Sequence, residues 1–151
     1  MFSLRFCLQC WLFGLALVFS PTSFAAKPPA TIDPIIITAQ DTLDFGTISD
    51  DDGTCTMDSS GLLSGTGSII CFGSGIPGSF GITGHKNRRV IISLIPGSSV
   101  DGVSFTPQLV ESADQRLSPG GNTATVVGTL TLSNAIKGQK TLYYTISIDY
   151  Q

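Results

Sequence analysis

The segment from His85 to Arg89 gathers the side chains best suited to move a proton. It holds the only histidine of the chain beside Lys86, Arg88 and Arg89. Nearby cations disfavour protonation of an imidazole, so a neutral His85 would be available as a base. Nucleophilic catalysis also needs an orienting carboxylate and an activated nucleophile, and the sequence shows no obvious candidate and no G-x-S-x-G elbow. The pattern favours a hairpin loop that is solvated or contacts an acidic surface over a small hydrolase, and we expect no enzymatic activity.

Two other stretches match ligand-binding patterns only in part. Residues 73–78, Gly-Ser-Gly-Ile-Pro-Gly, fit G-x-G-x-x-G, but a second glycine-rich strand follows where a phosphate-binding helix should begin. Asp50, Asp51, Asp52 and Asp58 lack the alternate spacing and the distal glutamate of a calcium loop. A solvated acidic turn is the simpler interpretation. We therefore predict neither a cofactor nor a metal ion.

The N-terminus has the pattern of a secretory signal peptide over residues 1–25. Arg5 precedes an apolar run over residues 6–19, and small residues stand at Ser23 and Ala25. This run is short for a membrane-spanning helix, so cleavage is favoured over a retained anchor. We expect an exported protein, located in the periplasm, at the cell surface or outside the cell, with no stable membrane span after cleavage.

The remaining residues, 26–151, have the length of one domain. The net charge of the whole chain is −3, which gives no broad attraction for phosphate backbones, so nucleic acid is not expected as a partner. Beyond the signal peptide only Cys55 and Cys71 remain. An isolated pair in an oxidising compartment predicts a disulfide, since a metal site from the same thiols would lack its other ligands.

The end of the chain has the clearest strand pattern. From Thr141 to Gln151, apolar and polar residues alternate, which predicts a half-buried strand that must pack within a sheet. Its inward face holds Leu142, Tyr144, Ile146, Ile148 and Tyr150. Residues 123–132 alternate in the same way and place Ala124, Val126, Leu130 and Leu132 inward. The unbroken apolar run over residues 89–95 predicts a central strand buried on both faces.

Short strands separated by turn signals run through the rest of the chain, and glycines argue against helix. Together they predict an all-β domain of about seven to nine strands, a β-sandwich with Greek-key connections, with a closed barrel as the weaker alternative.

Five motifs in this order carry a family likeness. They are Leu-Asp-Phe-Gly-Thr-Ile at residues 43–48, Phe-Gly-Ile-Thr-Gly at 80–84, Val-Ile-Ile-Ser-Leu at 90–94, Gly-Thr-Leu at 128–130, and Asp-Tyr-Gln at 149–151. Across residues 35–151 the chain resembles an uncharacterised family of secreted bacterial pilin-like domains. That family is similar to subunits of chaperone-usher fimbriae and to spore-coat-U-type pilins.

The resemblance implies an immunoglobulin-like sandwich exported by a Gram-negative bacterium for a structural or adhesive role at the cell surface. Pilins of that class lack one strand, which a periplasmic chaperone and then the N-terminal extension of the next subunit supply at an usher. The inward face of the last strand would then form the interface with the partner strand. Ile32, Ile35 and Ile37 would belong to the donor segment.

A second hypothesis remains open beside the fimbrial one. Pro28, Pro29 and Pro34 remove backbone N–H groups from the stretch before Ile35, which weakens its ability to pair as a strand. If residues 35–39 instead pair within their own chain, the domain would be a complete binding module. Its loops, residues 73–78 or 117–122, would then recognise a glycan or a protein.

Overall fold

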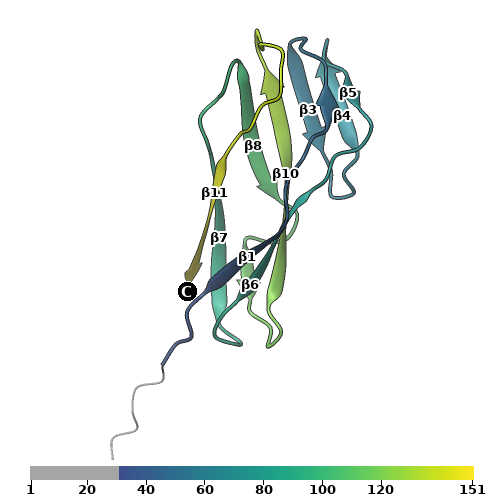
Figure 1. Ribbon diagram of the computed structural model, residues 1–151. Helices are drawn as coiled ribbons and strands as arrows, with labels where there is room; N and C mark the ends of the chain where they lie inside the picture. The colour runs from purple at the N-terminus through teal and green to yellow at the C-terminus, as the bar shows by residue number, and fades with distance from the viewer. Residues whose placement is uncertain (1–30) are drawn as a thin grey trace, which may run out of the picture. The chain divides into compact units, whose positions relative to one another are not determined.

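The computed structural model describes residues 31–151, and the expected signal peptide lies outside this range. All regular structure within it is β-strand, and every pairing is antiparallel (Figure 1). The strands are β1 (Ile36–Asp41), β2 (Thr47–Ile48), β3 (Gly53–Met57), β4 (Leu63–Gly67), β5 (Cys71–Phe72), β6 (Gly78–Thr83), β7 (Arg89–Pro96), β8 (Val103–Leu109), β9 (Asp114–Arg116), β10 (Asn122–Leu132) and β11 (Tyr144–Tyr150). The all-β prediction is confirmed. The strands outnumber those expected because β2, β5 and β9 are only two or three residues long.

The long strand β10 organises the larger, six-stranded sheet, whose order is β1-β6-β10-β3-β4 with β8 also paired to β10. At Val126, β10 faces Gly78 of β6 on one edge and Leu109 of β8 on the other. From Gly128 to Leu132 the edge of β10 that pairs with β6 earlier in the strand pairs with β3 instead. Consequently β6 and β3 follow one another along one edge of β10, and β8 occupies the opposite edge.

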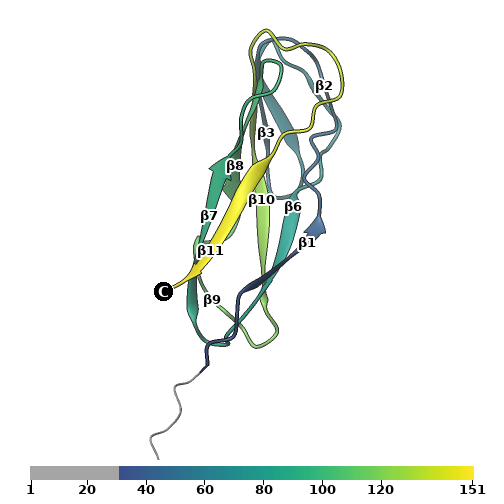
Figure 2. The ribbon, with the colours of Figure 1, turned by 60° about the vertical axis from the view of Figure 1, so that its left-hand side comes forward.

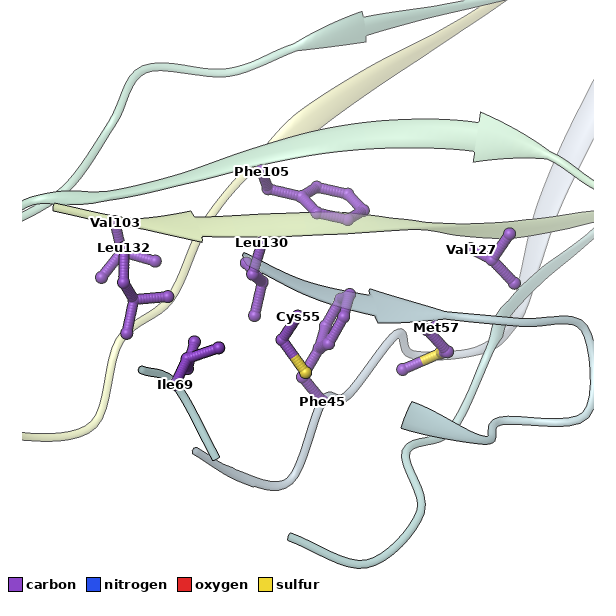
Figure 3. Close-up of a cluster of buried hydrophobic side chains, with 9 residues drawn as sticks. All are labelled: Phe45, Cys55, Met57, Ile69, Val103, Phe105, Val127, Leu130 and Leu132. Atoms are coloured by element: carbon purple, nitrogen blue, oxygen red, sulfur yellow. The ribbon is translucent and has the colours of Figure 1, made fainter. Parts of the chain in front are cut away.

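Two smaller sheets cover the inner face of the large one, a three-stranded sheet β11-β7-β9 and the pair β2-β5. One buried cluster joins β6, β7 and β10 through Ile82, Val90, Ile92, Leu117 and Ala124, and Ile35, Leu109, Ile146, Ile148 and Tyr150 pack against it. The other cluster lies over β3, β8 and β10 and is drawn in Figure 3. It consists of Phe45, Cys55, Met57, Ile69, Val103, Phe105, Val127, Leu130 and Leu132. The covering layer is therefore made of two pieces, one over each half of β10.

The inward residues predicted for β10 are confirmed, since Ala124, Val126, Leu130 and Leu132 are all buried. The alternation is interrupted in the middle of the strand, where Val127 and Gly128 are buried beside Val126. The prediction for β7 is partly wrong. This strand does lie centrally, between β11 and β9, and Val90 and Ile92 are buried, but Ile91 and Ile95 are 42% and 56% exposed. Nothing in the described chain covers that outer face, because the sheet is the outermost layer. The apolar run over residues 89–95 does not reveal that only one face of the strand is buried.

The disulfide between Cys55 and Cys71 is present, with Cα atoms 6.2 Å apart. It ties β3 of the large sheet to β5 of the covering layer. Closing a loop of this size is worth about 3 kcal/mol in the chain-entropy account. The bond thus fixes the smaller covering sheet, which has only two strands, onto the large sheet.

Several strand edges have no partner strand within residues 31–151. These are the outer edges of β1, β4 and β8 in the large sheet, and of β9 and β11 in the three-stranded sheet. The domain is therefore not a closed barrel, and its packed antiparallel layers fit a β-sandwich. No helix in the described range has the length and apolar character needed to cross a membrane.

Candidate functional site

A groove of about 1090 Å³ opens on the side of the domain bordered by β1 and β11, which Figure 2 turns toward the viewer. One wall comes from residues 41–50, between the end of β1 and β3, and the other from residues 135–140 and 142–144, which lead into β11. The floor consists of Phe80, Val103, Phe105, Leu130 and Leu132 of the large sheet. We call this feature the strand groove. It lies between the two pieces of the covering layer, so the covering layer is interrupted there.

Aromatic rings form the centre of the groove. The ring of Tyr144 meets Phe105 edge-on, with centroids 5.7 Å apart, and Phe80 at 6.3 Å. Phe45 contacts Phe105 from the other wall, at 5.8 Å. Burial raises the pKa of the Tyr144 hydroxyl above its usual range, because the phenolate would lose hydration there. The floor is therefore suited to apolar side chains.

The inward face of β11 is less covered than the strands beneath it. The strand predicted over residues 141–151 begins only at Tyr144, so Leu142 lies just before it. Within β11 the predicted inward residues Tyr144, Ile146, Ile148 and Tyr150 are only half-buried, and so is Leu142. Inward residues of β10 such as Ala124 and Val126 are fully buried instead. Of the predicted partner-strand residues, Leu142, Tyr144 and Ile146 line the groove. Ile148 and Tyr150 lie outside it and pack against the buried cluster around Ile82 and Val90.

The strand on the other side of the opening, β1, is more exposed than β11. All residues of β1 are exposed, although β1 pairs with β6 from Ile36 to Ala39. Each of β1 and β11 has a partner on one edge only. Each strand therefore presents an edge of unpaired backbone groups to which an extended segment could add.

The predicted donor residues occupy three different environments. Ile32 precedes β1 and is 50% exposed. Ile35 packs against the buried cluster around Ile82 and Val90 in its own domain. Ile37 lies within β1 and faces Ile82 of β6 in the strand register. The segment from Ile35 onward is thus engaged within its own chain.

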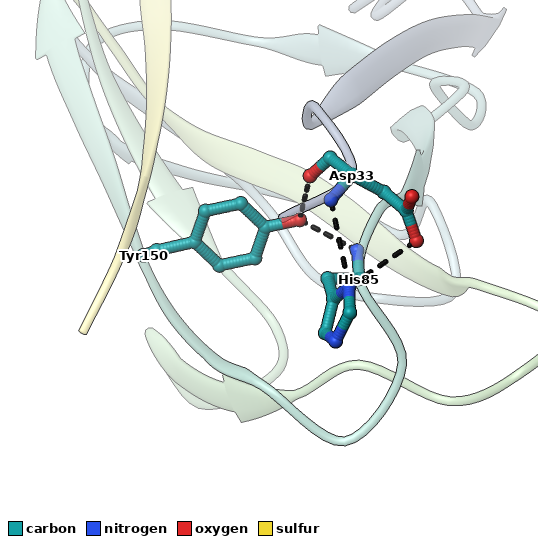
Figure 4. A network of polar contacts seen from close by, with 3 residues as sticks. All are labelled: Asp33, His85 and Tyr150. Atoms are coloured by element: carbon teal, nitrogen blue, oxygen red, sulfur yellow. Dashed lines mark hydrogen bonds and ion pairs between the residues drawn. The ribbon is translucent and has the colours of Figure 1, made fainter. Parts of the chain in front are cut away.

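A polar clasp closes the end of the domain beyond the groove (Figure 4). The hydroxyl of Tyr150 donates to the backbone carbonyl of Asp33 at 2.7 Å and accepts from the backbone N–H of His85 at 2.6 Å. The carboxylate of Asp33 lies 3.3 Å from Nδ1 of His85. We call these three residues the clasp. It joins the lead-in to β1, the turn between β6 and β7, and the end of β11.

The clasp gives a structural role to His85, one of the basic residues of the segment from His85 to Arg89. Sequence reasoning missed that a carboxylate faces His85, because Asp33 lies 52 residues away along the chain. Arg89 is also paired, through two hydrogen bonds with Asp114 of β9. Asp33 is 69% exposed at its side chain, unlike the buried carboxylate that orients the histidine of a catalytic triad. These contacts join structural elements and present no nucleophile to His85.

The residues of the other two candidate ligand-binding patterns take part in local hydrogen bonds or lead into a strand. Asp58 accepts from the hydroxyl and the N–H of Ser60 and from the N–H of Leu62, and these donors lower its pKa. Asp52 accepts from the N–H of Asn134. Within residues 31–151 no three potential metal-ligating side chains gather. The glycine-rich stretch at 73–78 leads directly into β6, a strand.

Comparison with models of protein families, with curated proteins and with solved structures finds no match to this chain.

Proposed function

We propose that this protein is an exported, non-enzymatic structural subunit of the bacterial surface, related to pilins, that is completed by a strand from another chain. The observation that carries the proposal is the strand groove. Its apolar floor is bordered by the end of β1 and the start of β11, each with one unpaired edge, and β-strand addition requires such an edge for backbone pairing and side-chain sites beneath it. The resemblance in sequence to pilin-like domains supports the same conclusion.

The finer fold belongs to this proposal as well. A pilin-like domain is an immunoglobulin-like sandwich with Greek-key connections and one strand missing. In this protein β11, the last strand, would be the strand beside the vacant position, and β1 would border it from the other layer. The two-piece covering layer supports this assignment, because one added strand would make the layer continuous.

The chemistry of the groove defines the segment that would fill it. Phe80, Phe105 and Tyr144 call for large apolar side chains at alternate positions, since successive residues of a strand point to opposite faces. In the proposal a periplasmic chaperone supplies that strand first and a like subunit supplies it at the usher. Ile32 would belong to the donor segment, because it lies in the stretch Thr31–Pro34 that precedes β1. Ile35 and Ile37 could act as donors only if β1 left β6.

The proposal is tested on the oxidised mature protein, refolded alone. We expect self-association, because the outer edges of β1 and β11 stay unpaired, and we expect a peptide of residues 26–39 or a pilus chaperone to convert the protein into a soluble 1:1 complex. Light scattering coupled to size-exclusion chromatography measures both. A monomer that unfolds in two states and responds to neither additive would contradict the proposal.

A matched pair of variants locates the binding site. Ile146→Arg introduces a charge into the groove, and Thr145→Arg introduces the same charge on the outer face of β11, where Thr145 is exposed. Complex formation should be lost in the first variant and kept in the second. Equal binding by both variants would place the partner elsewhere.

The pairing of β1 with β6 favours a second candidate, a domain complete in itself that binds a glycan or a protein through its loops. In that case residues 73–78 or 117–122 would make the contacts. The refolded protein would then be a stable monomer that binds in a glycan array, and exchanging either loop would abolish the signal.

A further inference from the structure

Residues 31–41 lead into β1 and form it, at the outer edge of the large sheet beside β6 (Figure 1). We call this segment the strap. None of its side chains is buried, and only that of Ile35 is half-buried. The strap therefore removes little apolar surface from water, and its attachment depends mainly on hydrogen bonds.

The backbone pairing that holds the strap is short and irregular. β1 faces β6 from Ile36 to Ala39, and the register then shifts, so that Gln40 has no opposite residue before Asp41 faces Ser79. Such a bulge disrupts the ladder of hydrogen bonds locally. The other edge of β1 has no partner strand within residues 31–151. A strand with one paired edge and no buried side chains can open locally at a low cost in free energy.

Side-chain contacts fix the strap at both of its ends. At the end of β1, the hydroxyl of Ser79 donates to the carboxylate of Asp41 at 2.6 Å. At the N-terminal end stands the clasp, in which the Tyr150 hydroxyl bonds to the Asp33 carbonyl and to the N–H of His85. The clasp makes more contacts than the Asp41 end, because the carboxylate of Asp33 also lies 3.3 Å from Nδ1 of His85.

The Tyr150 hydroxyl occupies a space that only glycine leaves free at position 84. A Cβ atom on Gly84 would collide with the hydroxyl oxygen of Tyr150 and lie 3.0 Å from Cδ1 of Leu117. Gly84 directly precedes His85, whose N–H is the donor to this hydroxyl. The turn between β6 and β7 is thus shaped to receive the ring that ties the strap to the rest of the domain.

The closed strap withholds two of the predicted donor residues. Ile35 packs against the buried cluster around Ile82 and Val90, and Ile37 faces Ile82 in the strand register. Neither side chain can keep this position and enter the groove of another copy at the same time. Donation by these residues therefore requires that β1 leave β6 and that the clasp open.

We propose that the clasp is an autoinhibitory latch, which keeps the strap closed on its own domain and limits how often Ile35 and Ile37 become available to a second copy. This inference rests on the proposed function, because the second copy is the like subunit proposed there. It adds a regulation of that assembly. An intact clasp slows strand donation between copies, and an open clasp permits it.

Hydrogen exchange of the mature protein tests the latch itself. Tyr150→Phe keeps the ring and removes the hydroxyl, so the amides of residues 36–39 should exchange about tenfold faster, because the closed strap loses two hydrogen bonds. Gly84→Ala, which displaces the hydroxyl without removing it, should act in the same direction. The amides of β4, at the opposite end of the strand order, should keep their rates.

Tyr143→Phe is the matched control for exchange, since Tyr143 is 74% exposed and makes no contact in the clasp. It should leave the exchange at residues 36–39 unchanged. If Tyr150→Phe and Tyr143→Phe gave the same rates there, the latch would be refuted whatever the groove binds.

Association of full mature copies, followed by light scattering, tests the consequence. Its rate should rise about tenfold in Tyr150→Phe, in proportion to the open strap. Ile36→Cys with Thr83→Cys, two positions that face each other in the register, should join the strap to β6 by a disulfide and slow association. Ile36→Ser with Thr83→Ser is the control that cannot form this bond.

The outcomes separate the latch from the proposed function. Faster exchange in Tyr150→Phe without faster association, in a protein whose wild type does associate, would overturn the autoinhibitory role and leave the proposed function standing. If neither form associates or binds a peptide of residues 26–39, the proposed function fails, and the autoinhibitory role fails with it even where the exchange rates show a closed strap.

Discussion

At the scale of single residues, two tyrosines of β11 share one face of the strand and have different surroundings. Tyr144 packs its ring against Phe80 and Phe105 in the groove, and burial raises its pKa. Tyr150 uses its hydroxyl to join Asp33 and His85. Under the proposed function the first residue would contact the partner strand, and the second joins three segments of the domain at the far end of β11.

The raised pKa of Tyr144 has a definite effect on stability. The folded protein retains this proton more strongly than the unfolded chain, whose tyrosines titrate near pH 10. The contribution is therefore complete below about pH 10 and is lost as pH rises through the higher pKa of the folded state. Absorbance of the phenolate during alkaline titration should show one late tyrosine, which is absent in Tyr144→Phe. A late step that persists in this variant would assign it to another tyrosine.

Loss of the Tyr150 hydroxyl tests the clasp. Tyr150→Phe removes two hydrogen bonds and should lower the free energy of unfolding by about 1–2 kcal/mol. Tyr143→Phe is the control, because Tyr143 is 74% exposed, and its effect should stay within about 0.5 kcal/mol. Urea unfolding measures both. Similar effects of the two substitutions would show that the clasp adds nothing to stability.

At the scale of elements, β10 depends on a close approach at Gly128, where its edge passes from β6 to β3. A Cβ atom at this position would lie 2.2 Å from the carbonyl oxygen of Thr106 in β8. Gly128→Ala should therefore force β8 and β10 apart and destabilise the protein by about 1–3 kcal/mol. Gly120→Ala is a matched control, since nothing lies within 4 Å of a Cβ atom there. Thermal unfolding compares the two, and equal melting temperatures would refute this packing.

The inward residues of β10 and β11 were largely predictable from the sequence, apart from Val127, and the groove was not. The inward residues of β10 and the face of β11 follow from a period of two, which is a local property. The groove combines residues 41–50 with residues 135–144, which only the topology brings together. Likewise Tyr150 meets Asp33 across 117 residues. The outer face of β7 was mispredicted because an apolar run does not reveal which side is covered.

At the scale of the whole domain, the disulfide ties the two layers together. Replacing both Cys55 and Cys71 with alanine should lower the free energy of unfolding by about 3 kcal/mol, because the unfolded chain regains the entropy of an open loop. Denaturant titration of the oxidised protein and of the double variant measures the difference. An unchanged midpoint would mean that β5 is held in place without the bond.

The central claim is that β11 borders a vacant strand position, and amide hydrogen exchange tests it most directly. The mature protein refolded alone should be compared with the protein isolated in the form that cells export. The account predicts fast exchange at the outward-edge amides of β11, residues 144–150, in the refolded protein and strong protection in the exported form. Strong protection of these amides in both samples would contradict it.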